Sequence, residues 1–201
     1  MNIYTTPEAL QGVCARNGDI INATFSTANQ TIAKISCTGN IQVHTIYNGV
    51  ATTETYSDLT NTVLALKADA DTLVSIEGEV TKLIFHENLF ITLGTIDLKN
   101  IITNNSRNLQ YLDVSTNLKL TSLDVSKNTA LTTLYCTSCT SLTSLRCNAY
   151  NEGVTSKLSA AITDATSTTG TVTVFAPLTY ASTIKTAATT KGWTYTEQET
   201  A

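Results

Sequence analysis

Charged side chains are scarce in this 201-residue chain. Asp, Glu, Lys and Arg together make up 14% of it, and the net charge is −4; typical globular domains carry about a quarter of charged residues. There is no run of lysine or arginine, so the chain lacks the basic patch that nucleic-acid binding requires. No stretch approaches about 18 consecutive apolar residues, so we expect no membrane-spanning segment.

Histidine is also scarce, and the common catalytic motifs are missing. His44 and His86 are the two histidines, and neither has a serine or cysteine nucleophile beside it in the sequence. The chain contains no glycine-rich phosphate loop, no HExxH zinc motif and no GxSxG elbow. We therefore expect no catalytic residues, no bound metal and no cofactor, and we interpret both histidines as structural or surface residues.

The first residues, M-N-I-Y-T-T-P-E-A-L-Q, lack the basic and apolar regions of a secretory signal peptide. Either the protein is made without export, or the chain begins after a cleavage site. Threonine makes up roughly a fifth of the chain, far above its usual share, as in many extracellular and virion β-proteins. We expect an extracellular, cell-surface or virion location, and a cytoplasmic one stays open as the alternative.

A regular repeat lies between Leu109 and Cys147. Leu109, Leu120, Leu131 and Leu142 recur at equal intervals, and each begins a unit with apolar residues at its first, fourth and sixth positions. Each unit would bury about three large apolar groups, worth roughly 1.5–3 kcal/mol apiece. Ordering its backbone costs on the order of 1–2 kcal/mol per residue. A single unit cannot be stable alone, so we expect neighbouring units to stack and share a core.

The ninth position of each unit is occupied by Asn117, Asn128 or Cys139. An inward-pointing asparagine can bond the buried backbone of a turn, because it has both a donor and an acceptor. Cys136 and Cys147 occupy apolar positions of the repeat. We therefore interpret the segment C-T-S-C as part of the repeat rather than as a metal or redox pair, since no second pair or nearby histidine completes a site.

These units resemble leucine-rich repeats of the type common in gut Bacteroidetes, with the pattern L-x-x-L-x-(V/L/C)-x-x-(N/C)-x-L. Two such units make one repeat of about 22 residues. The resemblance implies an α/β fold that is mainly β: a solenoid of short parallel strands, whose coils span residues 77–150. It also implies a cap at each end, with an N-terminal helix and β cap over residues 1–76 and a C-terminal α/β cap over residues 151–201.

Two irregular units precede the regular ones. They follow the same template, the second one residue short: Val80, Leu83, Phe85 and Asn88, then Leu93, Ile96, Leu98 and Asn100. We interpret residues 101–108 as a longer connection.

The N-terminal cap is expected to be mainly strands. A short helix from about Pro7 to Arg16 comes first, because Thr6 can cap it and Gly18 can end it. Short apolar or alternating runs then predict strands, at 33–37, 41–47, 62–68 and 72–77. Turn residues separate them: Gly39-Asn40, Asn48-Gly49, Asp58 and Asp69–Asp71.

The C-terminal cap is expected to alternate helices and strands. A helical stripe of apolar residues begins at Val154, and T-V-T-V-F at 171–175 follows as a strand. A second helix ends at Gly192, and W-T-Y-T-E is the last strand. In the family that the chain resembles, such helices replace the outer half of each turn.

The outward residues of the repeat strands form the candidate binding surface: Tyr111, Asp113, Asp124, Tyr135 and Arg146. Successive units alternate between two sheets, so we expect Asp113 to lie with Tyr135 and Asp124 with Arg146. The sequence leaves open which sheet is concave; the helix after Arg146 favours a concave, strand-lined position for Asp124 and Arg146, because helices take the convex half. Tyrosine and arginine are favoured in binding hot spots; the alternative is that all five are ordinary solvated residues.

Two functions fit this sequence. The first is a non-enzymatic recognition module that binds a protein or a glycan at a cell surface, because a repeat builds an extended surface. The second is a structural or decorating component of a bacteriophage virion or other large assembly, with other subunits as partners. An enzyme is the weakest of the three hypotheses. Asp97, Asp113 and Asp124 occupy equivalent outward positions, which leaves a calcium ladder as an alternative to a solvated face.

Overall fold

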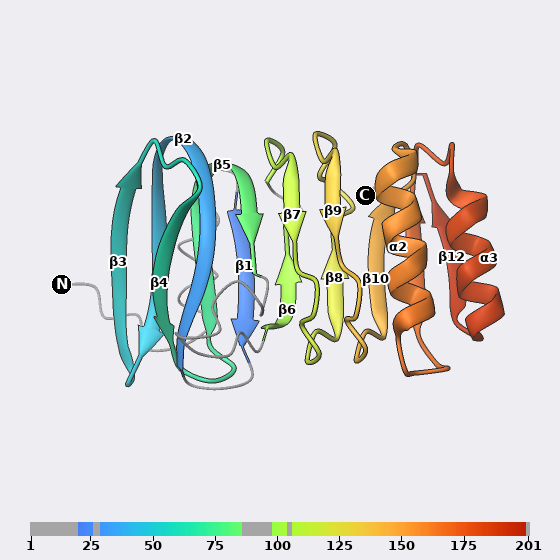
Figure 1. Ribbon diagram of the computed structural model, residues 1–201, viewed down its shortest axis with the longest axis horizontal. Coiled ribbons are helices and arrows are strands. Elements are labelled where there is room, and N and C mark those ends of the chain that lie inside the picture. The colour runs from blue at the N-terminus through green and yellow to red at the C-terminus, as the bar shows by residue number, and fades with distance from the viewer. Residues whose placement is uncertain (1–19, 26–28, 86–97, 104–105, 200–201) are drawn as a thin grey trace.

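The chain folds as a mainly β protein with one mixed sheet, as the computed structural model shows (Figure 1). The structure describes residues 20–25, 29–85, 98–103 and 106–199. Within these ranges the elements are β1 (Ile20–Phe25), β2 (Asn29–Tyr47), β3 (Val50–Ser57), β4 (Thr62–Ala68), β5 (Leu73–Ile84), β6 (Leu98–Ile102), β7 (Tyr111–Asp113), β8 (Ser122–Asp124), β9 (Thr133–Tyr135), β10 (Ser144–Asn148), α2 (Glu152–Asp164), β11 (Thr171–Phe175), α3 (Ala181–Lys191) and β12 (Thr194–Gln198).

The N-terminal strands are antiparallel. β5 lies at their centre, between β1 on one edge and β2 on the other. The far edge of β2 pairs first with β4 and then with β3. In β4, Leu64, Leu66 and Ala68 are buried while the residues between them are exposed or partly exposed. This is the period of two that predicted the strand.

β2 is one continuous strand of 19 residues, which corrects the predicted strand boundary at Gly39 and Asn40. Gly39 has a φ of 67° and lies where the pairing between β2 and β5 shifts, between Thr38 and Gln42. Gly78 of β5 faces this bulge, and a Cβ atom there would lie 2.6 Å from the Asn40 carbonyl oxygen. A bulge inserts turn-like residues without ending the strand, so the turn signal was misleading.

The hairpin between β2 and β3 turns at Asn48 and Gly49, as predicted. Their φ angles of 51° and 71° are left-handed, which suits an Asn-Gly pair. The Asp69 carboxylate accepts hydrogen bonds from both backbone amides, at 2.8 and 2.9 Å, and ties the hairpin to the end of β4. β3 itself was not predicted, because its threonine-rich sequence has no alternating apolar residues.

Beyond β5 the chain forms two rows of short parallel strands. One row consists of β5, β7 and β9, and the other of β6, β8, β10, β11 and β12. Tyr111 pairs with Thr133 and Ser122 pairs with Ser144, so neighbouring repeat strands of a row are two repeat units apart in sequence. Successive repeat units therefore alternate between the rows, which β1 and β5 join.

The repeated leucines fill the space between the two rows. Leu109, Leu120, Leu131 and Leu142 are each at most 1% exposed. The residues at the fourth and sixth positions of their units belong to the same core. Because both rows contribute to it, each unit is buried against its neighbours rather than by itself.

The ninth position of each unit bonds the buried backbone, as predicted. Asn117 donates through Nδ2 to the carbonyl oxygen of Phe85, which holds the sixth position of the preceding unit in the same row. Asn128 follows the same pattern in the other row. The Cys139 thiol does so more weakly, with its sulfur 3.2 Å from the carbonyl oxygen of Val114.

The unit before the regular repeat has a register that differs from the prediction. Asn100 pairs with Ser122 of β8, so it lies in a strand rather than at the ninth position. Thr103 and Ser106, which were predicted to lie in a longer connection, hold the sixth and ninth positions and are fully buried. Asn128 donates to both of their carbonyl oxygens at 2.7 Å. An apolar template cannot recognise polar residues at these positions.

The first irregular unit begins within β5, which ends at Ile84. That strand crosses the boundary predicted between residues 76 and 77, and Val80, Leu83 and Phe85 are buried as expected. Asn88, Leu93, Ile96 and the helix expected from Pro7 to Arg16 lie outside the described residues.

The C-terminal segment has the predicted order of helix, strand, helix and strand. α2 packs against β9 and α3, and in Figure 1 the two helices lie side by side at the end of the molecule opposite β3. The helices thus continue the row of β7 and β9, while β11 and β12 extend the other row. Gly192, with a φ of 85°, ends α3. Neither helix of the described ranges is long and apolar enough to cross a lipid bilayer.

Candidate functional site

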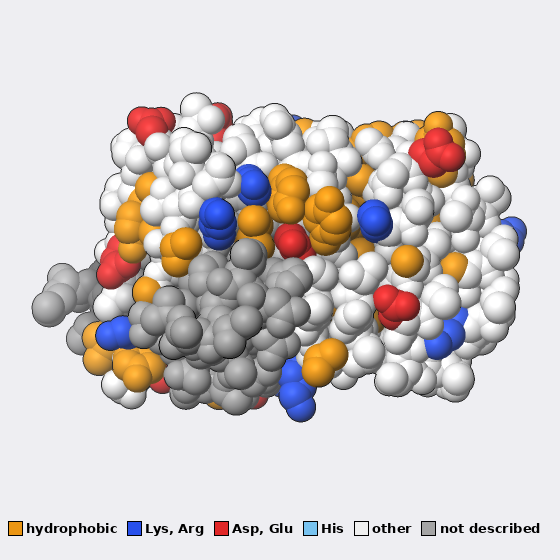
Figure 2. Space-filling model, in the orientation of Figure 1, with side chains coloured by type: hydrophobic (Ala, Val, Ile, Leu, Met, Phe, Trp, Pro, Cys, Tyr) orange, Lys and Arg blue, Asp and Glu red, His pale blue; other side chains and the backbone are white. Residues whose placement is uncertain are grey.

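The outward face of β5, β7 and β9 gathers lysine and tyrosine side chains. Residues that alternate with the buried leucines of these strands point away from the core. Lys82 pairs with Tyr111, and Asp113 pairs with Tyr135, across the row. Figure 2 shows hydrophobic side chains (orange) adjoining side chains of the Lys and Arg class (blue) near the middle of the molecule.

Four of these side chains form one line. The Lys82 ammonium nitrogen lies 4.5 Å from the centre of the Tyr111 ring. The ring centres of Tyr111 and Tyr135 are 5.8 Å apart, with their planes at 47°. The Lys157 ammonium, from α2, lies 5.6 Å from the centre of the Tyr135 ring. These are distances of cation–π and aromatic contacts, and we call the four side chains the Lys–Tyr row.

The Lys–Tyr row is a positive region of a protein whose net charge is −4. Lys34 of β2 pairs with Ile84, so it shares the outward face with Lys82. Three ammonium groups therefore share this face with the Asp113 carboxylate. Within the described ranges, no ion pair involves any of these three lysines, Lys34, Lys82 and Lys157.

Asp113 is held in place at the edge of this row. It is 9% exposed, and its Oδ1 accepts hydrogen bonds from the backbone amide and the hydroxyl of Ser115. Burial raises the pKa of Tyr111 above its usual value, and the charge of Asp113 and the neighbouring Tyr135 add to the effect. Tyr111 therefore keeps its proton at neutral pH and adds no negative charge to the face.

The other row carries a second group of polar residues on β8 and β10. Asp124 accepts a hydrogen bond from Arg146 Nε at 3.1 Å. The Arg146 guanidinium carbon also lies 4.7 Å from the ring centre of the buried Phe175 in β11. Ser126 donates to the same carboxylate. Asp124 thus neutralises the charge of Arg146, and Phe175 stacks on its guanidinium group. This face therefore offers a ligand less charge than the Lys–Tyr row does.

The residues predicted to form the binding surface therefore divide between two faces. Tyr111, Asp113 and Tyr135 lie together on β7 and β9. Asp124 and Arg146 lie together on β8 and β10, in the row that consists of strands throughout. The sequence predicted both pairings, because two repeat units return the chain to the same row.

Sequence reasoning missed the two lysines of the Lys–Tyr row. Lys82 stands two residues after Val80, in the position equivalent to Tyr111, so the repeat template contained the signal for it. Lys157 belongs to a helix, and the period of a strand could not place it against Tyr135.

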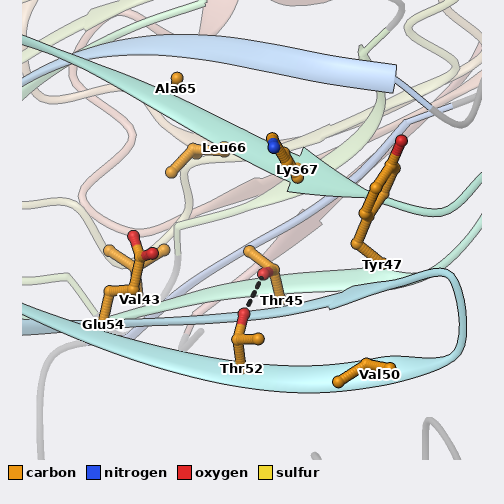
Figure 3. Close-up of a pocket in the computed structure, with 9 residues that line it drawn as sticks. All are labelled: Val43, Thr45, Tyr47, Val50, Thr52, Glu54, Ala65, Leu66 and Lys67. Carbon is orange, nitrogen blue, oxygen red and sulfur yellow. Dashed lines mark hydrogen bonds between the residues drawn. The ribbon is translucent and has the colours of Figure 1, made fainter.

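A groove of about 340 Å³ lies between the β2–β3 hairpin and β4 (Figure 3). The hydroxyls of Thr45 and Thr52 bond to each other at 2.9 Å on its wall. In Figure 3, Glu54 lies at one end, and Lys67 lies at the other, beside Tyr47. Among the described residues, neither Glu54 nor Lys67 forms an ion pair, and we assign the groove no chemistry.

His44 is buried on the opposite face of the same hairpin. Its Nδ1 lies 2.8 Å from the Thr53 hydroxyl, and its Nε2 lies 3.8 Å from a Glu77 carboxylate oxygen. A hydroxyl, an imidazole and a carboxylate in series are the groups of nucleophilic catalysis. The groove, however, is lined by the other face of β2 and does not open onto them. We interpret His44 as a structural residue; His86 lies outside the described residues.

The cysteines of the repeat are buried thiols. Burial raises the pKa of Cys139 and of Cys147 to about 12. It also raises the pKa of Cys136 well above its usual value. Reactive and metal-binding cysteines need the thiolate form, so these thiols act as small apolar side chains at neutral pH.

The carboxylates considered as a calcium ladder do not line up. Asp113 is on β7 and Asp124 is on β8, in different rows, and Asp97 lies outside the described residues. In the part of the chain that the structure describes, no group of His, Cys, Asp and Glu side chains could hold a metal ion.

No known protein family matches this chain, and neither a curated protein nor a solved structure matches it.

Proposed function

We propose that this protein is a non-enzymatic recognition module built as a leucine-rich repeat solenoid of the Bacteroidetes type. The parallel pairing of strands two repeat units apart, the ninth-position bonds to the preceding unit and the shared leucine core support this assignment. On this assignment β1 to β4 and the part of β5 up to residue 76 belong to the N-terminal β cap, the coils span residues 77–150, and α2, β11, α3 and β12 form the C-terminal α/β cap. A partner then binds the outward residues of one row of strands, which form an extended surface.

The ligand in this proposal is a protein or a glycan at a cell surface, and it contacts the Lys–Tyr row. One observation carries the proposal: side chains from β5, β7, β9 and α2 meet in a single line, although they are far apart in sequence. Tyrosine is favoured in binding hot spots because it offers a large amphipathic surface at a low entropic cost. Lys82 and Lys157, which have no ion-pair partner among the residues that the structure describes, add a charge that a partner can neutralise.

Arrays of surface glycans and surface proteins test this function. The variant Tyr111→Ala/Tyr135→Ala should bind its array ligand about tenfold more weakly or worse, because each substitution removes an aromatic contact. Ser122→Ala/Ser144→Ala, on the other row, should bind like the wild type. Circular dichroism should show that all three proteins are folded. Wild-type protein that binds nothing on either array, or a tyrosine variant that binds undiminished, contradicts the proposal.

A structural role in a large assembly, such as a virion, is the second candidate, and β3 favours it. Every residue of β3 except Tyr56 is exposed, and Val50 is 61% exposed. Among the described strands it pairs with β2 alone, so none of them covers its other backbone edge. Glu54 is the one charged residue of β3, whereas natural proteins usually protect an edge strand with several charges, a proline or a bulge. A neighbouring subunit could therefore add a strand to this other edge of β3.

Sedimentation at increasing concentration tests the second candidate. Strand addition predicts that the protein associates and that Thr53→Pro in β3 abolishes the association. A protein that stays monomeric throughout, or a proline variant that associates like the wild type, excludes this use of β3.

A further inference from the structure

We propose that the ligand of the Lys–Tyr row is an acidic oligosaccharide. Its acid groups bind Lys82 and Lys157, a sugar ring rests on Tyr111 and Tyr135, and a sugar hydroxyl donates to Asp113. This inference rests on the proposed recognition function and specifies the chemistry of the ligand. It follows from three kinds of group that the face presents together: ammonium groups, aromatic rings and a carboxylate.

The two ammonium groups stand at opposite ends of the Lys–Tyr row. Lys82 is held 4.5 Å from the Tyr111 ring and Lys157 is held 5.6 Å from the Tyr135 ring. A cation–π contact restrains an ammonium group without neutralising it, so both charges are positioned before a ligand arrives. Lys34 adds a third positive charge beside Lys82. The complementary ligand therefore carries negative charge along its length.

The two aromatic rings lie between these ammonium groups. Their centres are 5.8 Å apart, and Tyr135 is 40% exposed. One face of a pyranose ring consists of C–H groups, which pack against an aromatic face, whereas the hydroxyls of the sugar point sideways. Two neighbouring rings thus suit a chain of sugar units that carries an acid group on either side of the contact.

Asp113 distinguishes an acidic sugar from an acidic peptide. Its carboxylate lies beside Tyr135 in the row, and both bonds from Ser115 go to Oδ1. A sugar hydroxyl can donate a hydrogen bond to such a carboxylate, and charged acceptors make strong hydrogen bonds. A peptide of aspartate and glutamate offers only its backbone N–H groups as donors, whereas every unit of an acidic oligosaccharide also carries hydroxyls that can donate to Asp113. The ligand that satisfies all three groups carries both acid groups and hydroxyls.

Calorimetric titration of the full chain with an oligogalacturonate tests the inference. The same oligosaccharide with its carboxylates methyl-esterified is the neutral probe, a sulfated oligosaccharide is the second anionic probe, and a glutamate peptide is the third. Oligogalacturonate should bind at least about tenfold more tightly than its methyl ester, and added salt should weaken it. Tighter binding of the sulfated probe also supports the inference, because a sulfated oligosaccharide is still an acidic glycan, with a different acid group.

Two lysine variants with equal net charge separate the site from general attraction. Lys82→Gln/Lys157→Gln should weaken oligogalacturonate binding about tenfold. Lys119→Gln/Lys127→Gln, in exposed turns away from the row, should leave oligogalacturonate binding unchanged. All four lysines are exposed or partly exposed, so both variants should fold. Equal losses in the two variants, preference for the methyl ester or preference for the glutamate peptide would each overturn the inference.

The outcomes also distinguish this inference from the function on which it rests. If no acidic probe binds while the arrays reveal a neutral or protein ligand that needs Tyr111 and Tyr135, the acidic glycan is wrong and the recognition function stands. If the arrays and the titrations both show no binding, both proposals fail.

Discussion

Single residues decide whether the buried turns of the repeat are satisfied. Asn128 accepts a hydrogen bond from the Thr103 hydroxyl and donates to two carbonyl oxygens. Cys139, at the ninth position of its own unit, has only its thiol as a weak donor. Spacing alone predicted these contacts, because an inward asparagine in a turn has few other partners. It could not predict that Tyr150 takes the next ninth position, with its hydroxyl 2.9 Å from the carbonyl oxygen of Asn128, since tyrosine resembles asparagine in neither size nor shape.

A matched pair of glycine substitutions tests the turn geometry. Ser138 is exposed and has a left-handed φ of 60°, whereas the equivalent Lys127 of the other row has no positive φ. A left-handed φ costs roughly 1–2 kcal/mol at most residues other than glycine, and glycine elsewhere costs roughly 0.5–1 kcal/mol. Ser138→Gly should therefore raise the free energy of unfolding by about 0.5–1 kcal/mol.

Lys127→Gly is the control and should lower the free energy of unfolding by a similar amount. Urea unfolding of both variants measures the difference. A loss of stability in Ser138→Gly equal to that in Lys127→Gly would show that the two rows have the same turn.

At the scale of elements, local sequence patterns predicted most strands and both C-terminal helices. β4 and α2 could be predicted because their buried residues follow the periods of a strand and of a helix. β3 could not, since exposed threonines carry no period. The register around Asn100 could not either, because Thr103 and Ser106 become core residues only through their bonds to Asn128, a contact between units.

The close packing of the C-terminal segment predicts the effect of one methyl group. A Cβ atom on Gly170 would lie 2.5 Å from two ring atoms of Trp193 and 2.9 Å from the Thr143 carbonyl oxygen. Trp193 is buried, and its indole nitrogen donates to the Ser167 carbonyl oxygen at 2.9 Å, so it cannot move freely. Gly170→Ala should lower the free energy of unfolding by about 1–3 kcal/mol.

The exposed Thr168, two residues away, provides the control. Thr168→Ala should change the free energy of unfolding by no more than about 0.5 kcal/mol in chemical denaturation. If Gly170→Ala is as stable as this control, α3 and β12 do not pack on the repeat as the structure shows.

At the scale of the whole molecule, the buried thiols couple stability to alkaline pH. Burial raises the pKa of Cys139 and Cys147 from 9.0 to about 12. The unfolded chain therefore releases these protons above pH 9 while the folded protein retains them. Their contribution is complete below pH 9 and is lost as the pH rises towards 12. Each thiol should lower the free energy of unfolding by on the order of 1 kcal/mol between pH 8 and pH 10.

Urea unfolding at pH 8, 9 and 10 measures this effect in the wild type and in Cys147→Ala. The variant is expected to be less stable at pH 8, because it loses buried atoms, but its stability should fall less steeply with pH. Identical pH dependence in the two proteins would mean that the Cys147 thiol is not buried in the folded state.

The candidate site could be predicted only in part, because it depends on the whole assembly of units. The alternation of units between two rows placed Tyr111, Asp113 and Tyr135 together. Lys157 enters the site because a helix takes the place of the next strand beside β9. No local pattern contains that contact, which arises from packing between a strand and a helix in different turns of the chain.

The recognition function and the acidic-glycan inference both depend on the alternation of repeat units between the two rows, and two deletions test this alternation most directly. Removing residues 120–141 takes one unit from each row, so every later element keeps its row. Removing residues 120–130 takes a single unit, which moves every later unit to the opposite row and α2 to the side of β6 and β8. The longer deletion should still unfold in one cooperative urea transition, at reduced stability, and the shorter one should show none. A shorter deletion that unfolds as cooperatively as the longer one would contradict the alternation.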